Sequence, residues 1–133
     1  MRIARYALGW TSALLLVALA GCDSGPPMGQ VTGKVTLDNQ PIQGLEVNFS
    51  PQDAKLGTTA IGYTQADGTY TLYYPGSEEG APAGDYIVSI APGEGGEEGG
   101  PQVQIPAKYN SATELRRTVK PGTNKIDFEL TSQ

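Results

Sequence analysis

The chain has 133 residues and a formal net charge of −5, with 14 acidic residues against nine Lys and Arg. It has no histidine and one cysteine, which argues against Ser-His-Asp or Cys-His catalysis, an internal disulfide and the usual zinc sites. An acidic chain is repelled by phosphate backbones, so we do not expect a nucleic-acid partner. We expect no enzymatic activity, no catalytic residue, no metal site and no cofactor.

The first 21 residues have the layout of a secretory signal peptide. Arg2 and Arg5 give a positive start, and Ala7 to Ala20 form an uncharged, mostly apolar run that ends in small residues. As a helix this run would reach only roughly 21 Å, whereas a membrane span needs about 20 residues. We therefore predict that residues 1–21 are cleaved and take no part in the fold.

The single cysteine lies directly after this apolar run. Leu19-Ala20-Gly21-Cys22 resembles the lipobox of bacterial lipoproteins, in which an aliphatic residue, a small residue and Gly or Ala precede the cysteine. The resemblance implies cleavage between Gly21 and Cys22, then acylation of the Cys22 sulfur by diacylglycerol carrying chains such as palmitate. Two or more acyl chains suffice for stable membrane anchoring. The implied location is the bacterial cell envelope, with the domain outside the cytoplasm and attached to a membrane through this lipid.

Residues 22–29 are predicted to form a lipidated tether, because they lack apolar periodicity and include two prolines. The seven residues after Cys22 span at most about 25 Å when extended. The folded domain should therefore lie close to the membrane.

From Gln30 onward, apolar residues alternate with polar ones, which is typical of strands with one buried face. Six or seven short strands are predicted, at residues 30–37, 45–49, 58–65, 69–74, 86–90, 115–119 and 126–130. Turns follow residue 37 and, through Ala66-Asp67-Gly68, residue 65; Asp-Gly between alternating segments is a strong hairpin signal. No convincing helical stripe is present. The pattern predicts an all-β, antiparallel sandwich with alternate residues buried between two sheets.

The turn and core positions of these strands form a motif that resembles the carboxypeptidase regulatory-like domains. The matching residues are Gly33, Val35, Pro41, Gly44 and Val47, then Ala66-Asp67-Gly68-x-Tyr70, then Pro82-x-Gly84-x-Tyr86, and a closing NKIDFEL. The resemblance implies a transthyretin-like (prealbumin-like) Greek-key sandwich of about seven strands over residues 30–133. It implies no activity, because these domains are non-catalytic and the motif consists of turn and core positions.

The candidate contact residues are Tyr63, Tyr73 and Tyr109, since aromatic side chains are favoured at interfaces and can stack on sugars. The alternative is that these tyrosines pack against a half-buried sheet. The expected function is a lipid-anchored, non-catalytic envelope β-sandwich that acts as a structural or protein-interaction module. The alternative function is a surface lipoprotein that binds a small ligand or glycan. The sequence does not identify the envelope protein or glycan concerned.

Acidic and lysine residues suggest three further hypotheses. The loop from Pro92 to Pro101 is rich in glycine and acid and could bind calcium, but it lacks the spacing of a dedicated site. Glu78-Glu79 and Glu97-Glu98 could supply a carboxylate pair for hydrolysis, but we expect them in solvated loops. Lys34 and Glu79 resemble the isopeptide-forming residues of collagen-adhesin B-type domains, although the phase of the strand predicts that Lys34 faces solvent.

Overall fold

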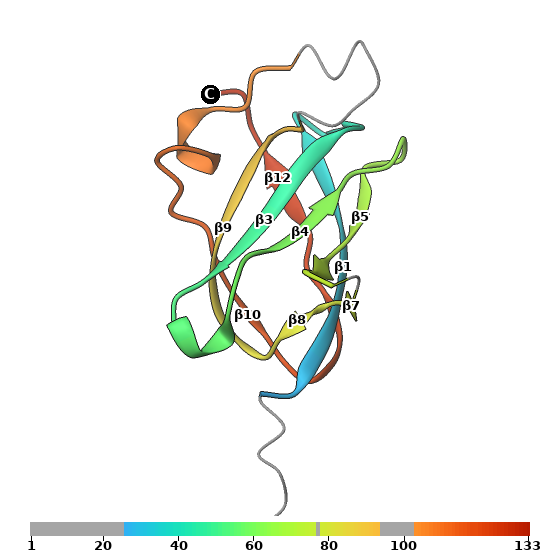
Figure 1. Cartoon of the computed structure of the whole chain (residues 1–133). Coiled ribbons are helices and arrows are strands. Elements are labelled where there is room, and N and C mark those ends of the chain that lie inside the picture. The colour runs from blue at the N-terminus through green and yellow to red at the C-terminus, as the bar shows by residue number, and fades with distance from the viewer. Residues whose placement is uncertain (1–25, 77, 94–102) are drawn as a thin grey trace, which may run out of the picture.

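The computed structural model describes residues 26–76, 78–93 and 103–133 and shows an all-β sandwich (Figure 1). Two sheets pack face to face and enclose the hydrophobic core. The helices among the described residues are two 3-10 turns, η1 (Ala54–Leu56) and η2 (Ala107–Tyr109). Nothing in this part of the chain forms a helix long and apolar enough to cross a membrane. The predicted all-β sandwich is confirmed.

The first sheet is built around one long strand, β1 (Met28–Leu37). Its partners are β2 (Gln40–Pro41), β5 (Thr69–Thr71), β8 (Ala81–Pro82), β11 (Gly122–Lys125) and β12 (Phe128–Leu130). β11 and β12 run parallel to β1, whereas the other three strands run antiparallel to it. The sequence predicted antiparallel strands throughout. An alternating pattern specifies which side chains are buried but carries no information on strand direction, so the parallel pairing was not foreseeable.

The second sheet is antiparallel throughout and lies in front of the first in Figure 1. Its strands, in spatial order, are β10 (Arg116–Val119), β9 (Gly84–Pro92), β3 (Leu45–Pro51), β4 (Ala60–Tyr63), β6 (Tyr73–Tyr74) and β7 (Glu78–Glu79). The predicted strand at residues 69–74 is divided at Leu72, because β5 belongs to the first sheet and β6 to the second. The Asp-Gly turn therefore connects the two sheets. Beside the turn the N–H of Gln65 donates to the carbonyl of Thr69 at 2.7 Å, and β4 and β6 pair farther along, at Ile61 and Tyr73.

The two predicted turns are formed by the residues that favour them. Asp38 and Asn39 have φ angles of 50° and 67° and make a two-residue turn, with Leu37 opposite Gln40. In the second turn, the carboxylate of Asp67 accepts hydrogen bonds from the backbone N–H of Thr69 at 3.0 Å and from its hydroxyl at 2.6 Å. These bonds lower the pKa of the Asp67 carboxyl below its ordinary value.

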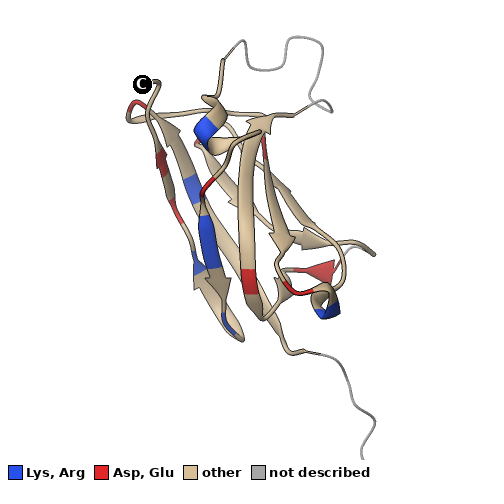
Figure 2. Ribbon diagram, turned by 90° about the vertical axis from the view of Figure 1, so that its left-hand side faces the viewer, with Lys and Arg blue, Asp and Glu red and all other residues tan. Residues whose placement is uncertain are grey.

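The core consists of the residues that the alternation placed on the inner faces. They include Val31, Val35, Leu45, Val47, Phe49, Leu72, Tyr86, Val88, Ile90, Phe128 and Leu130. The ring of Phe49 lies 5.8 Å from that of Tyr86 and 6.2 Å from that of Phe128, measured between centroids. The guanidinium of Arg117 lies 4.8 Å from the centroid of Phe128 and covers this ring at the β10 edge, where Lys and Arg residues gather (Figure 2). The predicted inner faces are confirmed.

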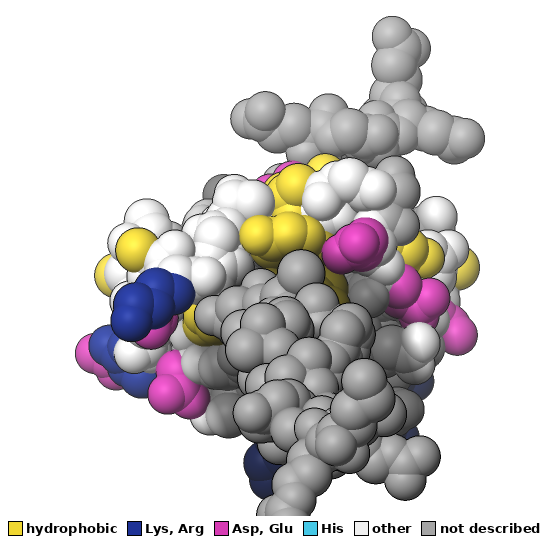
Figure 3. Space-filling view, turned by 60° about the horizontal axis from the view of Figure 1, so that its bottom comes forward, with side chains coloured by type: hydrophobic (Ala, Val, Ile, Leu, Met, Phe, Trp, Pro, Cys, Tyr) yellow, Lys and Arg dark blue, Asp and Glu magenta, His cyan; other side chains and the backbone are white. Residues whose placement is uncertain are grey.

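The chain enters the sandwich at one end and leaves at the other, as Figure 1 shows. The entry end holds the start of β1 and the turn before β11, where Gly29 lies opposite Gly122. Seen from this end in Figure 3, basic and acidic side chains surround exposed hydrophobic atoms, and Met28 is 37% exposed.

Candidate functional site

Two tyrosines lie exposed on the outer face of the second sheet. Tyr63 on β4 is 48% exposed and Tyr73 on β6 is 51% exposed. Because Ala60 and Gly62 point inward, the period of two turns Ile61 and Tyr63 outward. Ile61 is directly opposite Tyr73 in the ladder between β4 and β6. Strand pairing therefore places Tyr73 opposite Ile61 and diagonal to Tyr63, which is ten positions away in the sequence.

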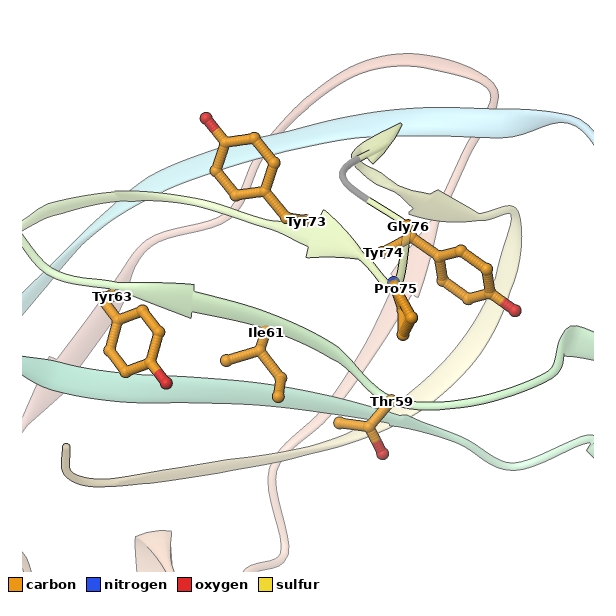
Figure 4. Close-up of a pocket in the computed structure, with 7 residues that line it drawn as sticks. All are labelled: Thr59, Ile61, Tyr63, Tyr73, Tyr74, Pro75 and Gly76. Atoms are coloured by element: carbon orange, nitrogen blue, oxygen red, sulfur yellow. The ribbon is translucent and has the colours of Figure 1, made fainter. Parts of the chain in front are cut away.

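These tyrosines border an open hollow of about 470 Å³, which we call the tyrosine groove (Figure 4). Its lining consists of Thr59, Ile61, Tyr63, Tyr73, Tyr74, Pro75 and Gly76. Figure 4 shows Tyr63 and Ile61 next to each other on β4, Tyr73 on the neighbouring strand β6 with its ring directed away from them, and Thr59 and Pro75 toward the other end. The groove is mainly apolar and aromatic, as small-ligand and peptide sites commonly are.

A second, more polar hollow of about 190 Å³ adjoins the tyrosine groove. It is lined by Tyr63, Gln65, Thr69, Tyr70, Thr71 and Tyr73, so the two exposed tyrosines belong to both hollows. It lies where β4 and β5 separate into different sheets. The two hollows together form a continuous surface that changes from apolar to polar across Tyr63 and Tyr73.

Each of the two exposed groove tyrosines lies directly opposite a glutamate on the neighbouring strand. Glu46 on β3 faces Tyr63, and Glu79 on β7 faces Tyr73. The Tyr63 hydroxyl donates a hydrogen bond to Oε2 of Glu46 at 3.3 Å, and the Asn48 amide donates to Oε1 at 2.8 Å. The negative charge of Glu46 raises the pKa of Tyr63 above its ordinary value. No Lys or Arg is among the residues that line the groove.

Tyrosines on the inner faces have structural roles. The hydroxyl of Tyr70 donates to the carbonyl of Ile126 at 2.6 Å, and that of Tyr86 donates to the carbonyl of Pro82 at 2.6 Å. Burial raises the pKa of both phenols, that of Tyr86 to about 12. Tyr74 is half-buried, and its hydroxyl donates to the carbonyl of Leu56 at 3.4 Å. It supports one end of the tyrosine groove.

Tyr109 lies apart from the other two candidate residues, on η2, and lines neither hollow. Its hydroxyl lies 3.3 Å from that of Thr131, and the Nζ of Lys108 lies 5.0 Å from its ring centroid. The hydrogen bonds with Thr131 lower the pKa of Tyr109. The three tyrosines therefore do not form one surface.

Sequence reasoning did not single out Ile61, Thr59 and Glu46 as parts of a site. The alternation that predicts Tyr63 on an outer face also places Thr59 and Ile61 on that face, so this signal was present. Glu46 could not be assigned, because its position depends on which strand pairs with β4.

The hypotheses based on acids and Lys34 have different outcomes. Glu78 and Glu79 form strand β7 instead of the expected loop, because they pair with Tyr74 and Tyr73, although both side chains are exposed as expected. Lys34 is exposed, as predicted, and Glu79 is exposed as well, so neither has the buried pocket that isopeptide formation needs. In the described ranges, no three His, Cys, Asp or Glu side chains are grouped to hold a metal ion.

Several predictions fall outside the described residues. These are the cleavage site at Gly21, the lipid attachment at Cys22, the first part of the tether, Glu97-Glu98 and most of the loop from Pro92 to Pro101. They remain predictions from the sequence.

Comparison with known proteins gives no match to any family model and none to any curated protein. Among solved structures, the chain is similar to a DUF3823 family protein from Parabacteroides merdae, with 14% sequence identity and a TM-score of 0.49. The similar region covers 78% of this chain and 46% of that protein. This chain therefore corresponds to about half the length of that protein.

Proposed function

We propose that this protein is a lipid-anchored, non-catalytic module of the bacterial cell envelope that binds a protein partner through its tyrosine groove. The single observation that carries the binding role is the pair of exposed tyrosines, Tyr63 and Tyr73, which lie on adjacent strands and line one groove. An exposed aromatic pair on a rigid sheet is a costly arrangement in water and is typical of contact surfaces. The motif from Gly33 to Tyr86 supports a carboxypeptidase regulatory-like, transthyretin-like module.

The groove favours binding over catalysis. Its lining residues carry hydroxyl, aromatic and aliphatic side chains but no histidine, cysteine or carboxylate. General acid–base catalysis needs a group that titrates near the working pH. The nearby Glu46 carboxylate is engaged by Tyr63 and Asn48, which orient it as a recognition group.

The polar hollow favours a second candidate, binding of a glycan. Gln65, Thr69 and Thr71 offer amide and hydroxyl groups beside the two tyrosines. Sugars present apolar C–H faces that stack on aromatic rings and hydroxyls that hydrogen-bond to such groups. A glycan array probed with the native protein and with Tyr73→Ala tests this candidate, and binding lost in the variant is the result expected of it.

The lipid anchor is supported by the lipobox and is tested by the intact mass of the protein extracted from native membranes. We expect a chain that begins at Cys22 and carries two or three acyl groups. The variant Cys22→Ser should be unacylated. A native chain that began at Met1, or one that was cleaved but unacylated, would contradict the anchor.

The role of the groove is tested by placing a photo-crosslinking amino acid at position 73 in living cells. A discrete protein adduct at position 73, absent from the same experiment at the exposed position 123, is expected. Equal crosslinking at both positions would indicate only random collisions and would count against a binding groove.

A further inference from the structure

We propose that the tyrosine groove binds a positively charged side chain, Arg or Lys, in an extended segment of the partner polypeptide. This inference rests on the proposed binding function and assigns the chemistry of the partner. The observation that carries it is the register of four adjacent strands, in which Glu46 lies opposite Tyr63 and Glu79 lies opposite Tyr73.

The register places acids at both borders of the aromatic surface. Directly opposite residues in an antiparallel ladder project from the same face of the sheet, with Cβ atoms about 4.5–5.5 Å apart. Glu46 and Glu79 are on β3 and β7, which are separated by β4 and β6, so their backbones are three strand spacings, roughly 14 Å, apart across the sheet and two residues apart along it. An occupant that lies between the tyrosines therefore has a carboxylate on either side.

The aromatic rings themselves favour a cation. The face of a tyrosine ring is negative, and it attracts guanidinium and ammonium groups. Because the Tyr63 hydroxyl donates its hydrogen bond to Glu46, the ring gains electron density and its attraction for a cation increases. Ile61 and Pro75 offer apolar surface for the methylene stem of Arg or Lys.

The charge of Glu46 is not neutralised by its hydrogen-bond partners. These partners are the Asn48 amide and the Tyr63 hydroxyl, both of which are uncharged. The groove lining contributes no Lys or Arg, and the whole chain has a net charge of −5. A cationic side chain would complement the charges of Glu46 and Glu79 beside the groove, whereas a phosphate, sulfate or carboxylate group placed there would be repelled.

The shape favours a segment of polypeptide over a small amine. The tyrosine groove is open and continues into the polar hollow, since Tyr63 and Tyr73 line both. A charged side chain can occupy the apolar part while the neighbouring peptide groups reach Gln65, Thr69 and Thr71 in the polar part. A free amine would use only the first of these surfaces.

The test compares two fluorescent peptides that differ in charge but hardly in shape. One alternates arginine with serine, and the other has citrulline in place of every arginine. Binding to the full-length protein purified in detergent is measured by fluorescence anisotropy at low and high salt. We expect the arginine peptide to bind at least about tenfold more tightly, with an affinity that falls as salt rises.

Variants of the protein assign the effect to the groove. Glu46→Gln and Glu79→Gln should each weaken binding of the arginine peptide about two- to tenfold. Tyr73→Ala should abolish it. Glu129→Gln, which changes an exposed group, and Tyr109→Ala, which removes a half-buried ring, both lie away from the groove and should leave binding unchanged. Circular dichroism of every variant shows whether the sandwich remains folded, so a loss caused by misfolding is recognised.

Three results would overturn the proposal: equal affinity for the two peptides, no binding of the arginine peptide, or unchanged affinity in both glutamine variants. A neutral oligosaccharide that binds the native protein and both glutamine variants equally would also overturn it and would identify a glycan site. In each case a specific crosslink at position 73 would still support the groove as a binding site. The binding function of the groove and the positive charge of its partner are therefore tested independently.

Discussion

Tyr63 donates a hydrogen bond to the carboxylate of Glu46 at 3.3 Å, from the position directly opposite it on the neighbouring strand. The charge of Glu46 raises the pKa of the Tyr63 phenol because it disfavours a second negative charge nearby. We predict that Glu46→Gln lowers the pKa of Tyr63 toward its ordinary value. The measurement is an NMR titration of ¹³C-labelled tyrosine, with the Tyr63 signal assigned through Tyr63→Phe. Glu129→Gln is the control, and an equal shift in that variant would show that Glu46 has no specific effect.

Thr64→Val should destabilise the sandwich by about 1–3 kcal/mol, because it removes two hydrogen bonds in a buried place. The Thr64 side chain is 4% exposed, and its hydroxyl donates to the carbonyl of Ile42 at 2.6 Å and accepts from the N–H of Leu45 at 2.9 Å. Valine keeps the shape but leaves both backbone groups without this partner. Urea unfolding measures the change, and Thr123→Val at an exposed position is the matched control. Similar losses in both variants would disprove the role of the hydroxyl.

Alkaline pH should destabilise the fold through Tyr86. Burial raises the pKa of this phenol to about 12 in the folded state, above the ordinary value of 10.0. As the pH rises, the unfolded state therefore loses the Tyr86 proton before the folded state does. The stability contributed by the buried, neutral phenol is complete below pH 10 and is lost as the pH rises toward 12. Tyr86→Phe should reduce stability at neutral pH by about 1 kcal/mol, through loss of the bond to Pro82, and should make the alkaline decline shallower. Urea unfolding over this pH range checks both effects, and an unchanged alkaline slope would contradict the assignment.

Gly33→Ala should be the most damaging of these substitutions, with a loss of about 3 kcal/mol or more. A Cβ atom built at Gly33 would lie 1.8 Å from the carbonyl oxygen of Ile126 and 2.9 Å from the ring of Tyr70. The backbone between β11 and β12 would have to move away from β1. Thermal unfolding of this variant, compared with Thr123→Ala in the same sheet, measures the cost. A melting temperature equal to that of the control would show that the backbone accommodates the methyl group.

The inner faces of the sandwich could be predicted from the sequence because side-chain alternation is a local property of an extended backbone. The alternation correctly assigned Val31 and Val35 on β1, and Val88 and Ile90 on β9, to the core. Asp38 and Asn39 were likewise recognisable, because these residue types tolerate positive φ angles.

Strand partners could not be predicted, because they depend on contacts between distant parts of the chain. Nothing in residues 69–74 indicates that Leu72 separates a segment paired with β1 from one paired with β4. The same limit applies to the candidate site. Tyr63 and Tyr109 are equally plausible as contact residues in the sequence, and only pairing of β4 with β6 places Tyr63, and not Tyr109, beside Tyr73.

The parallel pairing of β1 with β11 and β12 makes the first strand of the sandwich depend on the last. Residues 29–32 and 35–37 find these partners at residues 122–125 and 128–130, so this part of the sheet cannot close until almost the whole chain is available. Contacts so distant in sequence slow folding, because a long loop must be closed before they form. This delay would keep the domain unfolded for transport through a membrane, which the lipid anchor proposed above would require.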